Sequence, residues 1–395
     1  MSSKTSVQSS SSDTTSSSSS SVTKSASASR IVTKMKSNNV RWAIRGIAGE
    51  LWHNVFIRQI RRARKFLGTK KQKRASLPRK NETAIVTGAT GGIGSKMAHE
   101  LAFRGYDVII AARNVELGQK LVLDIERELE KSSSTTKVVE PKPTISFMEY
   151  HADKHLSALD VASNLAVLNE TSPVTCLINN AGIMGKSEQL SMRVNLLGPV
   201  TLTLALLPML MKNCNKESSV VKIINVSSSA HLRATGVFAQ EDLSSSSKSL
   251  MNIFPDTPDE DLSTYAKSKL ALLQFSTLLR HTLPKNKGLQ VFDAHPGLVW
   301  TPLLRNHIGD KATNTLQKTG LARLIYKSPT EGSQALLAAL DHPAGTISEE
   351  QLYFVNGQPG GYASPESRDL KQSQQLLDRL IAPELEGIVQ LPDGW

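Results

Sequence analysis

The sequence predicts an α/β domain with a doubly wound, mostly parallel sheet covered by helices on both faces. Three observations support this prediction. Short apolar segments recur along residues 81–395, with helical stretches between them. Most of these segments are nearly continuous in apolar residues, as strands buried on both faces are. The first segment runs directly into a glycine-rich turn that opens a helix, which is typical of a βαβ unit.

The strands follow from apolar, β-branched runs that end at turn residues. The first of these runs ends at Gly88, and Gly105 ends the helix predicted over Gly94–Arg104. A charged helix is predicted over Val115–Lys131, because leucine and isoleucine recur there on one face. The predicted strands are Thr83–Thr87, Asp107–Ala111, Ile145–Tyr150, Val174–Ile178, Val220–Val226, Leu289–Ala294 and Leu352–Val355.

The basic charge of the chain belongs to its N-terminal part. The chain has 395 residues and a net charge of +12, but residues 1–80 hold 18 Lys and Arg against two acids. The remaining residues are therefore mildly acidic, which argues against nucleic-acid binding by the folded domain. Two cysteines, Cys176 and Cys214, exclude a disulfide scaffold and a cysteine-based zinc site.

The N-terminal part divides into two segments. Residues 1–39 are rich in Ser, Thr and Lys, and such a composition predicts a disordered tail. Residues 40–80 are predicted to form a basic amphipathic helix, over 40–67, and a linker. Three interpretations of this helix remain open: it lies on an anionic membrane surface, it is an organelle transit segment, or it packs without a targeting role. We expect an intracellular protein, membrane-associated or organellar, and not a secreted one.

The glycine-rich turn is Thr87-Gly88-Ala89-Thr90-Gly91-Gly92-Ile93-Gly94. Glycines let the backbone approach a pyrophosphate closely, and the helix N-terminus then offers free N–H groups to the phosphates. The alternative is an ordinary βα turn. Because the turn follows a strand and opens a helix, nucleotide binding is the favoured interpretation.

The end of the second strand, Ala111-Ala112-Arg113, bears on the choice of cofactor. In dinucleotide-binding folds this strand end meets the adenosine ribose, where an acid accepts from a free 2′-hydroxyl and an arginine pairs with a 2′-phosphate. Arg113 with no acid beside it favours NADP(H) over NAD(H). The alternative is a surface arginine at a strand end.

Further motifs close later strands or lie on a helix. Tyr265 and Lys269 are four residues apart, so they share one face if this segment is helical. Each motif alone is weak evidence, because such short patterns arise by chance. The motifs are Asn179-Asn180-Ala181-Gly182, Asn225-Val226-Ser227-Ser228-Ser229, Tyr265-Ala266-Lys267-Ser268-Lys269 and His295-Pro296-Gly297-Leu298-Val299-Trp300-Thr301.

In this order and on these elements, the motifs resemble those of the short-chain dehydrogenase/reductase family, a family with the Rossmann fold. The resemblance covers roughly residues 82–380, within a catalytic domain predicted over 81–395. It is strongest to the retinol-dehydrogenase-like branch, which the later segments Tyr353-Phe354-Val355-Asn356-Gly357 and Ser364-Pro365-Glu366-Ser367 also resemble.

The resemblance implies four catalytic residues. Tyr265 would donate a proton to a carbonyl oxygen in reduction and act as the base in alcohol oxidation. Lys269 would lower the pKa of Tyr265 and bind the nicotinamide ribose. Ser228 would hydrogen-bond the substrate carbonyl, and Asn195 would complete a proton relay through a water.

The resemblance also implies a set of cofactor contacts. Asp153, just past the third strand, is the nearest match to an acid that contacts adenine, with His151 as the alternative at that place. Tyr265 and Lys269 belong to this set as well. The other residues expected to contact NADP(H) are Thr87, Gly88, Gly92, Ile93, Gly94, Arg113, Asn180, Ala181, Gly182, Pro296, Gly297 and Thr301.

Taken together, the sequence predicts an NADP(H)-dependent oxidoreductase that interconverts an apolar alcohol and its carbonyl, such as a retinoid, steroid or lipid aldehyde. Apolar residues after the last motif, among them Leu298 and Leu303, suggest an apolar wall for the substrate. No metal site is expected, and the partners expected are a small substrate, a membrane surface through residues 40–67 and a second copy of the chain. The alternatives are a non-catalytic NADP-binding regulatory or scaffold protein at a membrane, and a pigment reductase of the protochlorophyllide type.

Overall fold

The computed structural model describes residues 81–133, 142–214, 220–238, 262–283, 288–343, 348 and 352–395. The predictions made for the tail over 1–39, for the amphipathic helix over 40–67 and for the linker up to residue 80 lie outside these ranges. The predicted domain boundaries, including a catalytic domain over 81–395, stay predictions.

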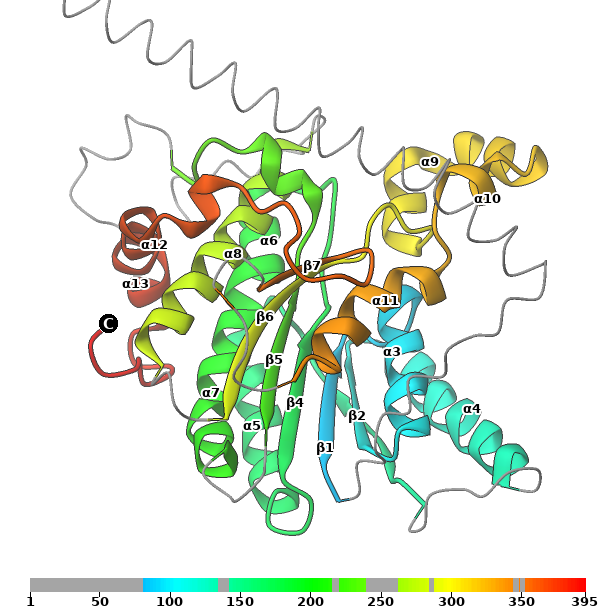
Figure 1. Cartoon of the computed structure of the whole chain (residues 1–395), viewed down its shortest axis with the longest axis horizontal. Helices are drawn as coiled ribbons and strands as arrows, with labels where there is room; N and C mark the ends of the chain where they lie inside the picture. The colour runs from blue at the N-terminus through cyan, green and yellow to red at the C-terminus, as the bar shows by residue number, and fades with distance from the viewer. Residues whose placement is uncertain are drawn as a thin grey trace, which may run out of the picture.

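A sheet of seven parallel strands forms the centre of the molecule (Figure 1). Its strand order is β3-β2-β1-β4-β5-β6-β7, and each neighbouring pair is parallel. Every predicted strand is confirmed, with ends that differ by at most one residue. The strands are β1 (Thr83–Thr87), β2 (Asp107–Ala112), β3 (Ile145–Glu149), β4 (Val174–Asn179), β5 (Val221–Val226), β6 (Leu289–His295) and β7 (Tyr353–Val355).

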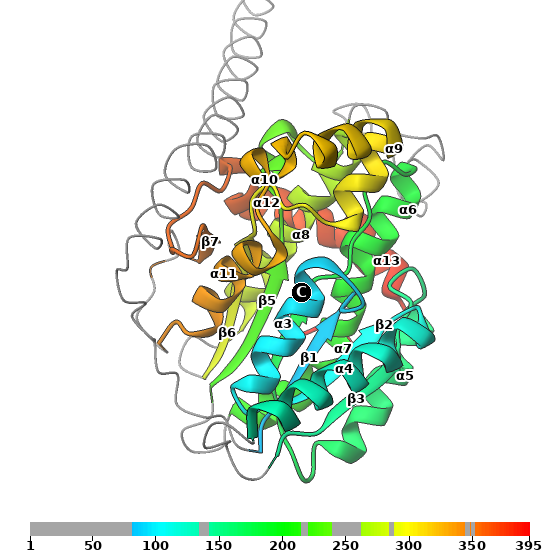
Figure 2. The ribbon, with the colours of Figure 1, turned by 90° about the vertical axis from the view of Figure 1, so that its right-hand side faces the viewer.

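Helices cover both faces of this sheet, which confirms the doubly wound α/β class (Figures 1 and 2). Because side chains alternate along a strand, β1 sends Ile85 into one hydrophobic core and Ala84 and Val86 into the other. The first core lies under α5 (His155–Leu168), α7 (Gly198–Cys214) and α8 (Ser263–Thr282), and the second lies under α3 (Gly92–Phe103), α4 (Val115–Ser133) and α11 (Pro329–Leu340).

The other helical segments follow β4, β5, β6 and β7. Two of them are π-helical turns, and the first of these joins α6 to α7 in one continuous helix over Glu188–Cys214. The segments are α6 (Glu188–Met192), η2 (Arg193–Leu197), η3 (Ser229–Arg233), α9 (Pro302–Lys318), α10 (Leu321–Ile325), η7 (Pro365–Arg368), α12 (Leu370–Leu376), η8 (Leu377–Ile381) and α13 (Ala382–Leu385).

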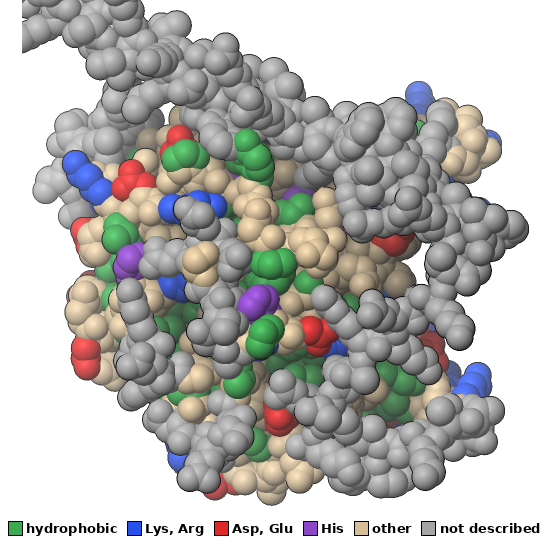
Figure 3. Space-filling view, viewed as in Figure 1, with side chains coloured by type: hydrophobic (Ala, Val, Ile, Leu, Met, Phe, Trp, Pro, Cys, Tyr) green, Lys and Arg blue, Asp and Glu red, His purple; other side chains and the backbone are tan. Residues whose placement is uncertain are grey.

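The helix Glu188–Cys214 is long and apolar enough to cross a membrane, and among the described residues it alone is. However, 78% of its most apolar window is buried inside the protein, and α7 packs on α5, β4 and β5. It is therefore the core helix of a folded domain. On the molecular face in Figure 3, charged side chains of both signs are interspersed with hydrophobic ones.

The strand order creates a crevice at the carboxyl edge of the sheet. The chain proceeds outward from β1 to β2 and β3, returns to pair β4 with the other side of β1, and then proceeds the other way. The loops after β1 and β4 therefore leave in opposite directions, and ligands of doubly wound folds bind in the space between such loops.

A polar ladder crosses the sheet near this edge. Asn179, Asn225 and Asp293 are register partners on β4, β5 and β6. The Asn179 Nδ2 donates to Asn225 Oδ1 over 2.8 Å, and Ser276 on α8 donates to Asp293 Oδ1 over 2.6 Å. Arg280, also on α8, donates to the other Asp293 oxygen over 2.8 Å. Burial raises the pKa of Asp293, although Arg280 opposes the shift. The ladder thereby ties α8 to the ends of the strands.

We predict that Arg280→Met lowers the free energy of unfolding by about 3 kcal/mol at pH 7, because it leaves a buried carboxylate unpaired. The loss should shrink toward pH 5, where an unpaired Asp293 takes up a proton. Urea unfolding at both pH values measures this. The control is Arg127→Met, which removes an exposed pair with Asp124 and should cost less than about 1 kcal/mol. Equal effects of the two variants would contradict the prediction.

Candidate active site

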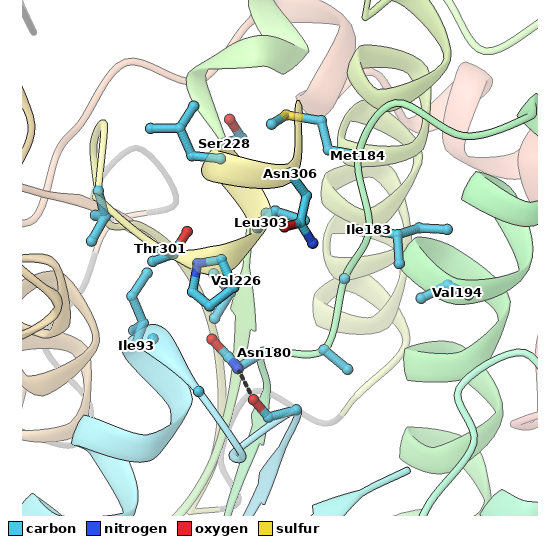
Figure 4. Close-up of a pocket in the computed structure, with 18 of the residues that line it drawn as sticks. Ile93, Asn180, Ile183, Met184, Val194, Val226, Ser228, Thr301, Leu303 and Asn306 are labelled. Atoms are coloured by element: carbon cyan, nitrogen blue, oxygen red, sulfur yellow. Dashed lines mark hydrogen bonds between the residues drawn. The ribbon is translucent and has the colours of Figure 1, made fainter. Parts of the chain in front are cut away.

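A cavity of about 970 Å³ opens at the carboxyl ends of the strands (Figure 4). Its walls come from the segments that follow β1, β2, β3, β4, β5 and β6 and from the start of α8. The structure brings together most of the predicted site residues here. Those that line the cavity are Gly88, Gly92, Ile93, Arg113, Asp153, Asn180, Ala181, Gly182, Ser228, Tyr265, Lys269, Pro296, Gly297 and Thr301.

The glycine-rich loop is built by close approaches that only glycine allows. A Cβ on Gly88 would lie 2.8 Å from the Cα of Ala181, and the φ of Gly88 is +63°. A Cβ on Gly94 would lie 2.5 Å from Asn180 Nδ2 and 2.7 Å from the Gly88 carbonyl oxygen. The loop therefore packs against the segment after β4 and leaves backbone exposed to the cavity.

Thr87 and Gly94 support this loop from behind and do not line the cavity. The Thr87 hydroxyl accepts hydrogen bonds from the backbone N–H groups of Asn180 and Ala181, over 2.9 and 3.0 Å. In return, the Asn180 side chain donates to the carbonyls of Thr87 and Gly88, and the bond to Gly88 spans 3.2 Å (Figure 4). These reciprocal bonds fix the two loops of the crevice to each other.

Two residues of the cavity wall, Arg113 and Asp153, are those expected at the adenosine end of a dinucleotide. Arg113, directly after β2, is exposed at the cavity wall. Asp153, after β3, has a buried Oδ1 with no hydrogen-bond partner among the described residues. His151 does not line this cavity and instead lies 2.8 Å from the Glu149 carboxylate. Of the two alternatives at this place, the structure puts Asp153 at the cavity.

Tyr265 and Lys269 lie near the start of α8, and both are buried. A side-chain hydrogen bond joins Ser228 and Tyr265. The Lys269 Nζ donates to the Val226 carbonyl over 2.9 Å and lies 5.8 Å from the centroid of the Tyr265 ring. The cavity therefore holds a hydroxyl, a phenol and an ammonium group side by side at the end of β5.

Burial is the main cause of the pKa shifts of Tyr265 and Lys269. It raises the pKa of Tyr265 to about 12, and the bond with Ser228 lowers it only in part. It lowers the pKa of Lys269 to about 8. Loss of hydration of the phenolate is the larger cause of the shift, and the expected lowering of the Tyr265 pKa by Lys269 stays a prediction. Tyr265 consequently holds its proton at neutral pH.

Asn195 does not line the cavity. It lies in the π-helical turn η2, fully buried, and its Oδ1 accepts from the Ile183 N–H over 2.8 Å. Its Nδ2 donates to the Ile183 carbonyl and to the Ser268 hydroxyl. The side chain thus holds in place the segment after β4 that does line the cavity, while its role in a proton relay stays a prediction.

The wall opposite Arg113 is mostly apolar. Ile183, Met184, Val194 and Leu303 surround the space beside Ser228 (Figure 4). Sequence reasoning missed several polar residues of the cavity, which are Tyr150, Lys186, Asn306 and His307. For Tyr150 a signal existed, since it is the last residue of the third predicted strand, whose carboxyl end points to the crevice. Its hydroxyl is buried without a hydrogen-bond partner in the described part of the chain.

A dinucleotide fits this cavity on three observations. The glycines leave a cradle that side chains would fill, and the N-terminus of α3 has no side-chain cap on its N–H groups. The unpartnered Asp153 oxygen and Tyr150 hydroxyl lie near the other end of the cavity. No cluster of three or more His, Cys, Asp or Glu side chains that could hold a metal ion occurs in the described ranges. The fold and site define the class of nicotinamide-cofactor dehydrogenases and reductases.

Comparison with known proteins narrows this class. A family model for short chain dehydrogenases matches residues 82–257. Mouse retinol dehydrogenase 13 is 31% identical over 319 residues, which are 77% of this chain and 83% of that protein. Mouse polyprenol dehydrogenase is 31% identical over 67% of this chain and 73% of its own length. The bovine dehydrogenase/reductase SDR family member 13 is 33% identical, and the chain covers 66% of its length.

The chain belongs to the short-chain dehydrogenase/reductase family, in its retinol-dehydrogenase-like branch. This confirms the resemblance found in the sequence motifs. A solved structure of an actinorhodin polyketide ketoreductase with NADPH shares the fold, with a TM-score of 0.51 and 22% identity, over 71% of this chain and 98% of that one.

Proposed function

We propose that the protein is an NADP(H)-dependent oxidoreductase that interconverts an apolar alcohol and its carbonyl. One observation carries this proposal. The buried Tyr265 hydroxyl, bonded to Ser228 and next to Lys269, faces a cavity that joins the glycine-rich loop to an apolar wall. The same cavity thus offers a place for a dinucleotide, a place for an apolar substrate and an acid between them.

When bound, the nicotinamide cofactor supplies or accepts the hydride, and the protein provides the positions and the proton. The glycine-rich loop and the N-terminus of α3 would bind its phosphates, and Asp153 would accept from the adenine amino group. Arg113 would pair with the 2′-phosphate that distinguishes NADP(H). Gly182, Pro296, Gly297 and Thr301 would line the nicotinamide end.

The chain's own residues divide the proton chemistry. Ser228 would hold the substrate oxygen, and Tyr265 would donate its proton to that oxygen in reduction and take it back in alcohol oxidation. Since Tyr265 is protonated at neutral pH, it is ready as the acid of the reductive direction. Lys269 would stabilise the phenolate left behind with its positive charge and bind the nicotinamide ribose. Asn195 would hold the water that returns the proton.

The apolar wall supports a retinoid, steroid or lipid aldehyde as the substrate. The names of the relatives, retinol dehydrogenase and polyprenol dehydrogenase, refer to apolar alcohols and agree with such a substrate. Attachment to a membrane through residues 40–67, an organellar location and a homo-oligomer remain predictions. A non-catalytic NADP-binding protein is the second candidate, and the completeness of the Ser228, Tyr265 and Lys269 set favours the enzyme.

We predict that Tyr265→Phe lowers kcat for reduction of an apolar aldehyde by about 10²–10⁴-fold, because the proton donor is lost. NADPH binding and the unfolding temperature should stay unchanged. Steady-state NADPH consumption on a panel of retinal, steroid ketones and medium-chain aldehydes measures the effect. Tyr106→Phe, a buried tyrosine of the α3 side of the core, is the control. Full activity in Tyr265→Phe would refute the assigned role, and NADPH binding without any turnover by the wild type would favour the non-catalytic candidate.

The pH dependence follows from Lys269. With a pKa of about 8, Lys269 is charged below that pH and neutral above it. We therefore predict that kcat/KM for reduction is constant near neutral pH and falls as pH rises through about 8. In Lys269→Arg, whose cation keeps its charge, the remaining activity should show no such decline up to pH 10. An identical decline in both proteins would assign it to another group.

Arg113 provides the test of cofactor choice. Arg113→Ala should raise the KM for NADPH about tenfold and leave the KM for NADH nearly unchanged, since only the contact with a 2′-phosphate is lost. Kinetics with each cofactor, at one ionic strength, measure both values. The control is Arg127→Ala, an exposed arginine on α4. A parallel rise for both cofactors would show that Arg113 does not read the 2′-phosphate.

A further inference from the structure

A buried lysine, Lys327, has no part in the mechanism above. It lies between α10 and α11 and is only 3% exposed. Its Nζ donates to the Pro296 carbonyl over 3.1 Å and to the Asn356 side-chain oxygen. Burying an ammonium group costs free energy unless hydrogen bonds compensate, so these contacts require an explanation.

The backbone of Lys327 holds the same segment as its side chain does. Its N–H donates to the Leu298 carbonyl, and its carbonyl accepts from the Trp300 N–H, each over 2.8 Å. Gly297, at φ +86°, passes so close that a Cβ there would lie 2.4 Å from the Lys327 Nζ. Lys327 therefore secures the cavity wall after β6 from Pro296 to Trp300.

The other partner, Asn356, belongs to the segment Tyr353–Gly357 that the mechanism leaves unused. It follows β7 in a tight turn, where Val355 and Gln358 exchange backbone hydrogen bonds, and its φ is +55°. Val355 is the register partner of His295, the last residue of β6. The chains that leave β6 and β7 thus start side by side, and the Lys327 ammonium group joins them.

We infer that Lys327, held by Asn356, is a positioning residue for the nicotinamide end of the cavity. The Pro296–Gly297 backbone lines the cavity, and Thr301, five residues after Pro296, packs on Gly92 of the glycine-rich loop. A shift of this wall would displace the cofactor from Tyr265, and displacements of about 1 Å reduce rates strongly. The inference rests on the proposed function, because it assumes that NADP(H) occupies this cavity.

The chain provides a matched control in Lys222. This second buried lysine is also 3% exposed, and its Nζ donates to the carbonyls of Ala339, Leu340 and His342. Those carbonyls lie at the C-terminal end of α11, whereas Lys327 precedes its N-terminal end. Lys222 lies near the start of β5, away from the carboxyl edge that forms the cavity.

The experiment compares Lys327→Met, Asn356→Gly, their double variant and Lys222→Met in the full chain. Three quantities are measured for each: the NADPH dissociation constant by fluorescence titration, kcat and KM for an apolar aldehyde, and the unfolding temperature. Asn356→Gly is compatible with the left-handed turn and removes the side chain that carries the amide. It also serves as the second variant if Lys327→Met fails to fold.

We expect Lys327→Met and Asn356→Gly each to raise the NADPH dissociation constant about tenfold and to lower kcat. The double variant should be little worse than Lys327→Met, since the two residues act through one contact. Lys222→Met should lower the unfolding temperature at least as much as Lys327→Met does. Its NADPH dissociation constant should stay within twofold of the wild-type value.

Two results would count against the inference, and they are distinguishable. If the wild type binds NADPH but Lys327→Met and Asn356→Gly bind it equally well, Lys327 is merely structural and the proposed function stands. If the wild type binds no NADPH, the proposed function itself fails, and the positioning role fails with it.

Discussion

The loops that leave β1 and β4 lie against each other where the strand order of the sheet reverses, and the rest of the site is arranged around this contact. Parallel strands bring their carboxyl ends to one edge, and the reversal opens a crevice there. The Thr87 hydroxyl accepts from both Asn180 and Ala181, while the close approaches at Gly88 and Gly94 leave no room for side chains. The contact thus holds the crevice open and leaves backbone exposed on the side of the glycine-rich loop.

Burial is the second constraint, and it sets the chemistry. Tyr265 and Lys269 lie on one face of α8, where loss of hydration raises the first pKa and lowers the second. Tyr265 is therefore a neutral phenol, and Lys269 is an ammonium group that easily loses its proton. The Lys269 Nζ lies 5.8 Å from the centroid of the Tyr265 ring. The position of α8 depends in turn on the polar ladder, through Ser276 and the ion pair of Arg280 with Asp293. The helix that carries the acid is therefore held in place through Asp293, a residue of β6.

Local patterns made the strands, the glycine-rich loop and the Tyr265–Lys269 pair predictable. Each depends on residues within one turn or one strand, so each forms a short pattern in the sequence, and the order of these patterns along the chain resembles that of the family. Features that depend on contacts between distant segments were not predictable. Asp153 and His151 differ by two positions, and only the fold shows which one reaches the cavity. The π-helical turn around Asn195 has no pattern distinct from an α-helix, and the pairing of Lys327 with Asn356 joins residues 29 positions apart. The raised pKa of Tyr265 depends on how completely the fold buries it.

Under the proposed function, NADPH bound in this cavity would give its hydride to an apolar carbonyl. Reduction of retinal by the full chain, with NADPH deuterated on the transferred C4 position and mass spectrometry of the alcohol, tests this directly. We predict one deuterium on the carbinol carbon, in an amount that matches the NADPH consumed. Alcohol formed without deuterium, or NADPH binding with no alcohol from retinal, steroid ketones or medium-chain aldehydes, would contradict it.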